Sequence, residues 1–106
     1  MGSALVGGLV ASGWDATSIV VVELDADKRA ALESQFGVRT SDVIVSAAGA
    51  LIAVKPGDVA SVCSEVSSLG ISRVLSIAAG VSLATLESAA GSSVAVVRAM
   101  PNTPAL

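Results

Sequence analysis

The sequence contains no histidine, a single cysteine and only two aromatic residues, Trp14 and Phe36. The absence of histidine excludes His-based catalytic triads, most zinc sites and the commonest general base. Because Cys63 is alone, an internal disulfide and a thiolate zinc cluster are excluded as well. Any chemistry must therefore come from a cofactor or from another part of the molecule.

Charge is also scarce. Charged residues make up 14% of the chain, the formal net charge is -3, and the six basic residues are scattered, which is a poor footprint for nucleic acid. No apolar run reaches the roughly 18 residues of a membrane span. No basic region precedes the first apolar stretch, so no secretory signal is indicated. We therefore expect a cytoplasmic protein that binds neither nucleic acid nor membrane.

The 106 residues are enough for one domain at most, and 53% of them are hydrophobic. The apolar residues are mainly Val, Ala, Leu and Ile. Small aliphatic side chains of this kind suit strands that are buried on both faces and helices packed tightly against them. The composition thus favours a folded domain and excludes a disordered chain.

Short apolar runs alternate with helical patterns along the chain. The expected strands are 19–24, 38–41, 50–54, 73–77 and 93–100; the first is expected to be fully buried and the third to be buried. The expected helices are 2–12, 25–37, 58–69 and 82–90, with Asp25 and Ser82 as N-caps; residues 42–49 are ambiguous. The alternation predicts an α/β fold, a doubly wound parallel sheet with helices on its faces.

In this class, ligands bind in the loops at the carboxyl ends of the strands. The corresponding loops follow Leu24, Val54, Ile77 and Val97, and they read "DAD", "KPGD", "AAGVS" and "RAMPNTP". They are rich in small, polar and proline residues instead of long charged side chains. This composition suits backbone contact with a flat cofactor that carries phosphates.

Two of these loops have a functional and a structural interpretation. Lys55 could meet a cofactor phosphate or carboxamide while Pro56 fixes the backbone, or Lys-Pro-Gly simply begins a helix. The segment Ala78–Gly80 could let a cofactor ring or ribose lie against the backbone, or it is a plain glycine turn before the helix that Ser82 caps.

The N-terminal part offers two weaker candidates. Glu23 could bond the hydroxyls of an adenine ribose, as acidic residues in dinucleotide folds do, or be a surface carboxylate beside Lys28. Met1, Gly2 and Ser3 open a helix whose free N–H groups could hold a pyrophosphate.

Near the C-terminus, Asn102 and Thr103 stand between Pro101 and Pro104. Their amide and hydroxyl could bond a nicotinamide or a substrate, or the stretch is an interdomain linker. Cys63, within the helix 58–69, is expected to be a small core residue.

Three motifs follow one another at characteristic spacing: "AVKPGDV", "SIAAGVSLATLE" and "VVRAMPNTPAL". Over nearly the whole chain, the sequence resembles the nucleotide-binding domain of pyrroline-5-carboxylate reductase. The resemblance implies an NAD(P)-binding Rossmann-like domain at residues 1–100 and, at residues 101–106, the start of a linker to a helical C-terminal domain that is absent here.

The resemblance also implies the function. The reduced nicotinamide of NADPH or NADH would donate a hydride to the imine carbon of 1-pyrroline-5-carboxylate, giving L-proline in proline biosynthesis. The cofactor-binding residues that it implies are Met1, Gly2, Glu23, Leu24, Ala53, Val54, Lys55, Pro56, Ala78, Ala79, Gly80 and Asn102. It assigns no catalytic residue and no metal ligand to this chain. The chain alone is expected to be inactive, and the full-length protein is expected to be a homo-oligomer.

The sequence departs from the family in three places, one of which is the segment from Gly37 to Ala53, which is shorter than in relatives, so that one crossover helix is expected to be abbreviated. The family's first strand and the first glycines of its GxGxMG motif are missing, with Met1 and Gly2 as the motif's last two residues. In a Rossmann order that strand is central, so its neighbours would have unpaired backbone groups and the chain is expected to be unstable or self-associating. In addition, Leu24 and Asp25 follow Glu23, where acidic residues oppose the 2′-phosphate of NADPH; Lys28 or Arg29 could still reach that phosphate.

Two other interpretations stay open. The chain could belong to another Rossmann oxidoreductase, such as a hydroxyacid dehydrogenase or a deazaflavin-dependent NADP reductase. It could also be a truncated, non-catalytic homologue that serves as a binding or pairing module.

Overall fold

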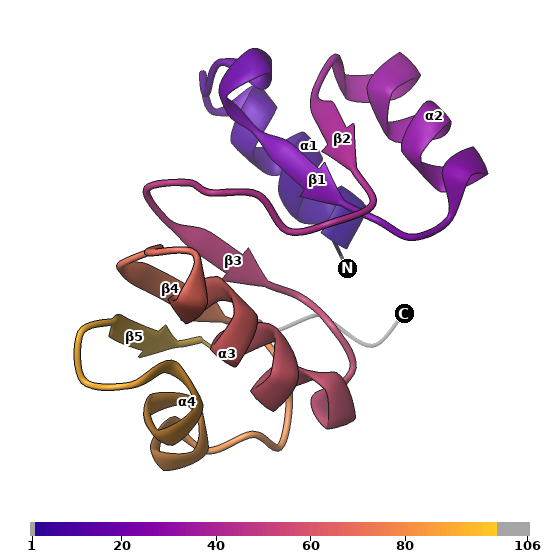
Figure 1. The fold of residues 1–106 in the computed structure, drawn as a ribbon. Helices are drawn as coiled ribbons and strands as arrows, with labels where there is room; N and C mark the ends of the chain where they lie inside the picture. Colours follow the sequence, from indigo (N-terminus) through magenta and orange to yellow (C-terminus); the bar gives the residue numbers. More distant parts are fainter. Residues whose placement is uncertain (1, 100–106) are drawn as a thin grey trace. The chain divides into compact units, whose positions relative to one another are not determined.

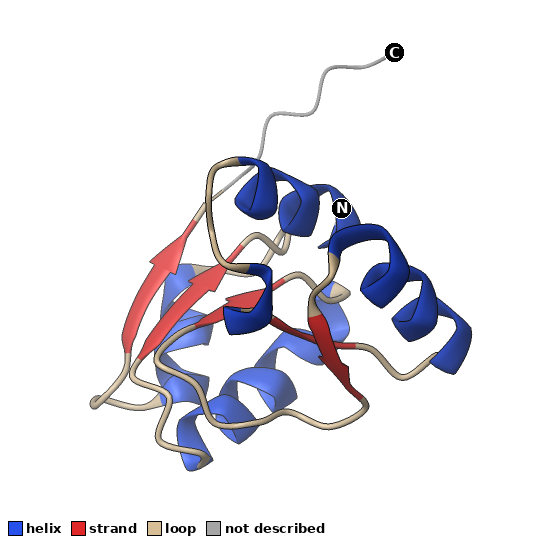
Figure 2. Cartoon of the chain, turned by 90° about the horizontal axis from the view of Figure 1, so that it is seen from above, coloured by secondary structure: helices blue, strands red, loops and turns tan. Residues whose placement is uncertain are grey.

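The computed structural model describes residues 2–99 (Figure 1). Figure 2 shows the strands in red and the helices in blue. The elements are α1 (Gly2–Ala11), η1 (Ala16–Ser18), β1 (Val20–Val22), α2 (Ala26–Phe36), β2 (Arg39–Ser41), β3 (Ala50–Ile52), η2 (Pro56–Asp58), α3 (Val59–Ser68), β4 (Arg73–Ser76), α4 (Leu83–Ala90) and β5 (Ala95–Arg98), where η marks a 3₁₀ helix. They form two compact units, Met1–Val45 and Ser46–Leu106, each of which is described by itself.

The first unit contains a two-stranded parallel sheet in which β1 pairs with β2. Helix α1 packs against α2 at Gly7, where an added Cβ would lie 3.1 Å from Cε1 of Phe36. The absence of a side chain at Gly7 therefore lets the Phe36 ring lie against α1. Among the described residues of this unit only Val6 and Val38 are buried hydrophobic residues, so its core is small.

The second unit contains a three-stranded parallel sheet in the order β3-β4-β5. Helix α3 packs on α4, and both helices also contact strands of the sheet. The buried hydrophobic residues of this unit are Ile52, Val59, Cys63, Val66, Ile71, Val74, Ala78, Val81, Leu86 and Ala90. Cys63 is a core residue, as the sequence predicts.

The helix ends follow the sequence signals. The Asp25 carboxylate accepts from the N–H groups of Asp27 and Lys28 at the start of α2, and the Ser82 hydroxyl accepts from the N–H of Thr85 at the start of α4. Parallel strands joined through helices in both units confirm the α/β prediction. None of the helices in the described part of the chain has the length and apolar character that crossing a membrane requires.

Two predicted strands are shorter and more exposed than expected. The strand predicted at 19–24 is formed only by β1, which contains no buried residue, and Leu24 is 83% exposed. The strand predicted at 50–54 is formed only by β3, where Ile52 alone is buried. Within residues 2–99, β1 pairs only with β2 and β3 only with β4, so each has one strand edge without a partner. A strand paired on one side buries less side-chain surface, and the predictions of full burial for 19–24 and of burial for 50–54 were wrong.

Replacing Leu86 by Ala tests the core of the second unit. Leu86 is fully buried in α4, so Leu86→Ala should lower the free energy of unfolding by about 2–5 kcal/mol, measured by urea denaturation. The matched control is Leu83→Ala in the same helix, where Leu83 is 42% exposed and the loss should stay below about 1 kcal/mol. Equal losses of unfolding free energy in the two variants would contradict the burial of Leu86 in this core.

The thiol of Cys63 should be protected in the folded protein. Its side chain is buried in α3, and burial raises the pKa of the thiol, so little reactive thiolate is accessible. We expect iodoacetamide to label Cys63 roughly a hundredfold more slowly without urea than in urea, which corresponds to an opening free energy of about 3 kcal/mol. Free cysteine in the same two buffers corrects for the solvent, and equal rates for the protein would exclude this burial.

Candidate functional site

The carboxyl ends of β3, β4 and β5 lie along one edge of the sheet. Ile52 pairs with Ser76, and Ser76 pairs with Arg98. The ladder continues for one further residue, since the N–H of Ile77 donates to the C=O of Ile52 at 3.1 Å and the N–H of Ala99 donates to the C=O of Ser76 at 2.9 Å. The structure therefore brings the predicted segments 53–56 and 78–80 to the same edge of one sheet.

The first of these segments leads directly into a helix. Lys55 is extended, its C=O accepts from the N–H of Asp58 at 2.9 Å, and Pro56 is the first residue of η2. The interpretation that Lys-Pro-Gly begins a helix is confirmed. Because Ala53, Val54 and the Lys55 side chain are exposed, the same loop also presents small side chains and a cation at the edge of the sheet.

In the second segment, a hydrogen bond to a buried serine fixes the backbone, and the last two residues are exposed to solvent. Ser76 is 1% exposed, and its hydroxyl accepts from the N–H of Ala78 at 3.3 Å, while Ala79 and Gly80 are exposed. Gly80 has a φ of +75°, and a Cβ added there would meet no other atom within 4 Å. The chain thus turns in a conformation that favours glycine and leaves open space beside its backbone.

Ser76 was missed by the sequence analysis. Its signal is a hydroxyl that follows the two apolar residues of β4, and its role, fixing the loop that follows, depends on a buried hydrogen bond that no spacing reveals.

In the first unit, Glu23 and Leu24 follow the end of β1. The N–H of Glu23 donates to the C=O of Ser41 at 2.9 Å, which extends the ladder to this position. The Glu23 carboxylate accepts from the N–H of Leu24 at 2.7 Å. Arg29, half-buried on α2, donates from Nη1 to the C=O groups of Glu23 and Leu24 at 2.7 and 3.0 Å. Arg29 therefore ties α2 to the strand end.

The remaining predicted residues are placed as follows. Gly2 is the first residue of α1, in the same unit as Glu23 and Leu24. Met1 and Asn102 lie outside the described residues, so their predicted roles in cofactor binding stay predictions. Within the first unit, Glu23 and Leu24 lie at the end of one strand. Within the second unit, Ala53–Pro56 and Ala78–Gly80 lie at the same edge of the sheet.

The titratable groups with shifted pKa values are not residues of these loops. Hydrogen bonds from the Thr17 hydroxyl and N–H lower the pKa of Asp15, which caps η1. Burial raises the pKa of Cys63, which makes it a poor nucleophile. Within residues 2–99, no group of three or more His, Cys, Asp or Glu side chains is placed to hold a metal ion.

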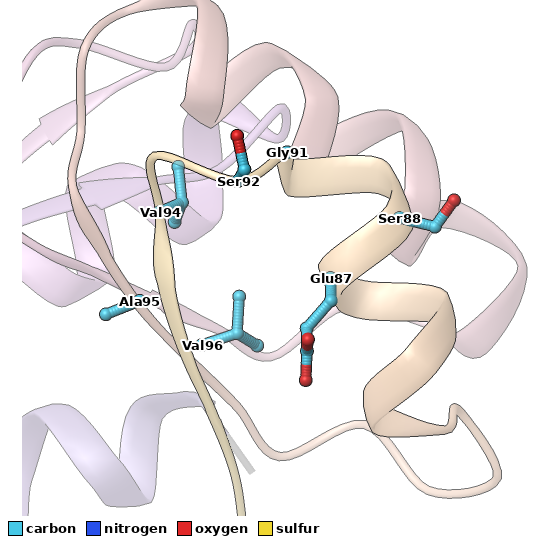
Figure 3. Close-up of a pocket in the computed structure, with 7 residues that line it drawn as sticks. All are labelled: Glu87, Ser88, Gly91, Ser92, Val94, Ala95 and Val96. Carbon is cyan, nitrogen blue, oxygen red and sulfur yellow. The ribbon is translucent and has the colours of Figure 1, made fainter.

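A shallow hollow of about 640 Å³ lies elsewhere on the second unit, between the end of α4 and the start of β5 (Figure 3). It is lined by Glu87, Ser88, Gly91, Ser92, Val94, Ala95 and Val96. Figure 3 shows the side chains of Glu87 and Val96 facing each other across it. Because β5 begins at Ala95, this hollow is at the amino end of the strand, opposite the edge that carries the predicted loops.

Comparisons with known proteins agree on one group of enzymes. The chain is 46% identical to the pyrroline-5-carboxylate reductase of Escherichia coli (strain K12), over 100% of this chain and 42% of the relative. It is 39% identical to the enzyme of that name from Pasteurella multocida, again over 100% of this chain and 42% of the relative. The chain therefore spans about two fifths of the length of these curated relatives.

A solved structure of a pyrroline-5-carboxylate reductase from Coxiella burnetii matches with a TM-score of 0.86 at 33% identity, covering 98% of this chain and 42% of that chain. This match confirms the Rossmann-like fold class, and the relatives confirm the resemblance that the three motifs indicate. The family model described as "NADP oxidoreductase coenzyme F420-dependent" matches residues 1–80. Since the match covers well over half of its residues, the chain belongs to this family of NADP oxidoreductases.

Proposed function

We propose that this chain is the nucleotide-binding part of a pyrroline-5-carboxylate reductase that uses NADPH or NADH. The observation that carries the proposal is that two predicted loops, 53–56 and 78–80, lie at the carboxyl edge of one parallel sheet. Ligands of open α/β sheets bind at this edge. The names of the relatives supply the reaction, which belongs to the whole protein.

The loops fit a flat cofactor that carries phosphates. The exposed backbone of Ala79 and Gly80 has no side chain larger than a methyl group, and the space where a Cβ of Gly80 would stand is open. A ring or ribose can therefore lie directly against the peptide groups. The exposed Lys55 offers a cation for a phosphate or a carboxamide at the same edge.

The cofactor supplies the hydride, and the residues of this chain bind and orient it. In the proposed reaction the hydride adds to the imine carbon of 1-pyrroline-5-carboxylate and a proton adds to the nitrogen, which gives L-proline. Because the chain has no histidine and Lys55 is assigned to cofactor binding, no proton-transfer step is assigned to this chain. We place the groups that protonate the nitrogen and bind the substrate carboxylate outside these 106 residues.

The family model favours one alternative. Its description names coenzyme F420, a deazaflavin, so reduction of NADP by a deazaflavin is the second candidate activity. The expectations of a homo-oligomeric assembly and of a cytoplasmic location concern the whole protein and stay predictions.

The activity is tested with the protein that carries this chain. NADPH or NADH should be oxidised when 1-pyrroline-5-carboxylate is added, with proline as the product, and the nicotinamide absorbance should stay constant when coenzyme F420 is added instead. Transfer between F420 and the nicotinamide, with no turnover of pyrroline-5-carboxylate, would support the alternative and overturn the proposal.

A pair of glycine variants tests the cofactor edge. Gly80 and Gly70 have φ values of +75° and +77°, and neither has an atom within 4 Å of an added Cβ. Gly80→Ala and Gly70→Ala should therefore each cost about 1–2 kcal/mol of stability. Only Gly80→Ala places a methyl group at the carboxyl edge, so it alone should weaken NAD(P)H binding, roughly tenfold by fluorescence titration. Equal NAD(P)H affinities of the two variants would mean that the cofactor binds away from the carboxyl edge.

A further inference from the structure

Ser76 is the last residue of β4, the middle strand of its sheet. It is 1% exposed, and in the part of the chain whose burial the structure describes it is the only polar or charged residue that is buried. Burying a hydroxyl group costs free energy unless a hydrogen bond compensates for it, and an alanine of nearly the same size would carry no such cost. Packing alone therefore does not account for a serine at this position.

The hydroxyl is bonded to the loop that follows the strand. Its Oγ accepts from the N–H of Ala78, two residues farther along the chain, at 3.3 Å. Ala78 is itself 5% exposed, so removing the hydroxyl would leave this buried N–H without the acceptor that it has here. Local bonds from a serine side chain to the backbone fix the turn in which they lie. The Ser76 side chain thus fixes the first residue of the loop 78–80.

The exposed part of this loop lies between two buried residues. Ala78 and Val81 are buried, whereas Ala79 and Gly80 between them are exposed. Immediately beyond Val81, the hydroxyl of Ser82 caps the start of α4. The exposed peptide groups are therefore held between a fixed strand end and a fixed helix start. A ligand that lies against them does not have to order the loop on binding, and this preorganisation favours affinity.

We infer that Ser76 is a positioning residue for the cofactor, whose hydrogen bond to Ala78 raises the affinity for NAD(P)H by holding the loop 78–80 in its binding conformation. Because Ser76 is 1% exposed, it acts through the loop and not by touching the cofactor. The inference rests on the proposed function, since it assumes that the cofactor binds against this loop. It goes beyond that function in assigning cofactor affinity to a buried residue outside the binding surface.

Three variants at position 76 separate the effect of the hydroxyl from that of side-chain size. Ser76→Thr keeps the hydroxyl and adds a methyl group, Ser76→Val has the shape of threonine without the hydroxyl, and Ser76→Ala only removes the hydroxyl. In the protein that carries this chain, Ser76→Val should bind NADPH or NADH about tenfold more weakly than Ser76→Thr, the factor that one hydrogen bond supplies. Strain from the added methyl group is common to both variants and cancels in this ratio. Ser76→Ala should show a similar loss relative to the wild type.

The matched control lies two residues earlier on the same face of β4. Val74 is 3% exposed, so Val74→Ala opens a cavity in the core and should lower the urea concentration at the midpoint of unfolding. It removes no bond to the loop, so its affinity for NADPH and NADH should equal that of the wild type. If Val74→Ala weakened cofactor binding as much as Ser76→Ala does, the role of Ser76 would be one of stability alone, and the inference would be overturned.

Amide exchange followed by NMR tests the hydrogen bond without a cofactor. The N–H of Ala78 should exchange about tenfold faster in Ser76→Ala than in the wild type, whereas the N–H of Ile77, which donates to the C=O of Ile52, should keep its rate. Unchanged exchange at Ala78, or equal cofactor affinities of Ser76→Val and Ser76→Thr, would contradict the inference and leave the proposed function intact. Failure of the wild type to bind either cofactor would overturn both.

Discussion

The hydrogen-bonded register of β3, β4 and β5 places Ile52, Ser76 and Arg98 side by side, and the candidate site of the second unit depends on it. Parallel strands deliver every loop that follows them to the same edge, so residues more than twenty positions apart in sequence become neighbours. A shift by one residue would also exchange the two faces of a strand, and buried Val74 and Ser76 would then face outward. Packing of the core therefore fixes the position of the loops.

The edge depends more on backbone than on side chains. Ser76 holds the loop after β4 through the N–H of Ala78, and Gly80 turns it. In the first unit, Asp25 and Arg29 satisfy the amides of α2 and the carbonyl groups at the strand end. Polar side chains here fix the backbone, and the proposed cofactor binding relies on contacts with that backbone.

Local signals in the sequence predicted much of this structure. Asp25 and Ser82 are strong capping residues that act over three or four positions, so the starts of α2 and α4 were readable. The lengths and burial of β1 and β3 could not be predicted locally, because they depend on which strands pair with each strand edge. The hydrogen bonds of Ser76 and Arg29 also escaped prediction, because these local bonds depend on the backbone conformation at the strand ends, which the residue pattern does not give. The predicted roles of Met1 and Asn102 fall outside the described residues.

Hydrogen exchange with and without bound NADH, followed by mass spectrometry, tests the central claim that the carboxyl edge holds the cofactor. The account predicts slower exchange of amides in residues 53–58 and 78–82, and unchanged exchange in 68–72 and 91–95 at the opposite edge. Protection confined to residues 87–96, around the hollow between α4 and β5, would contradict it.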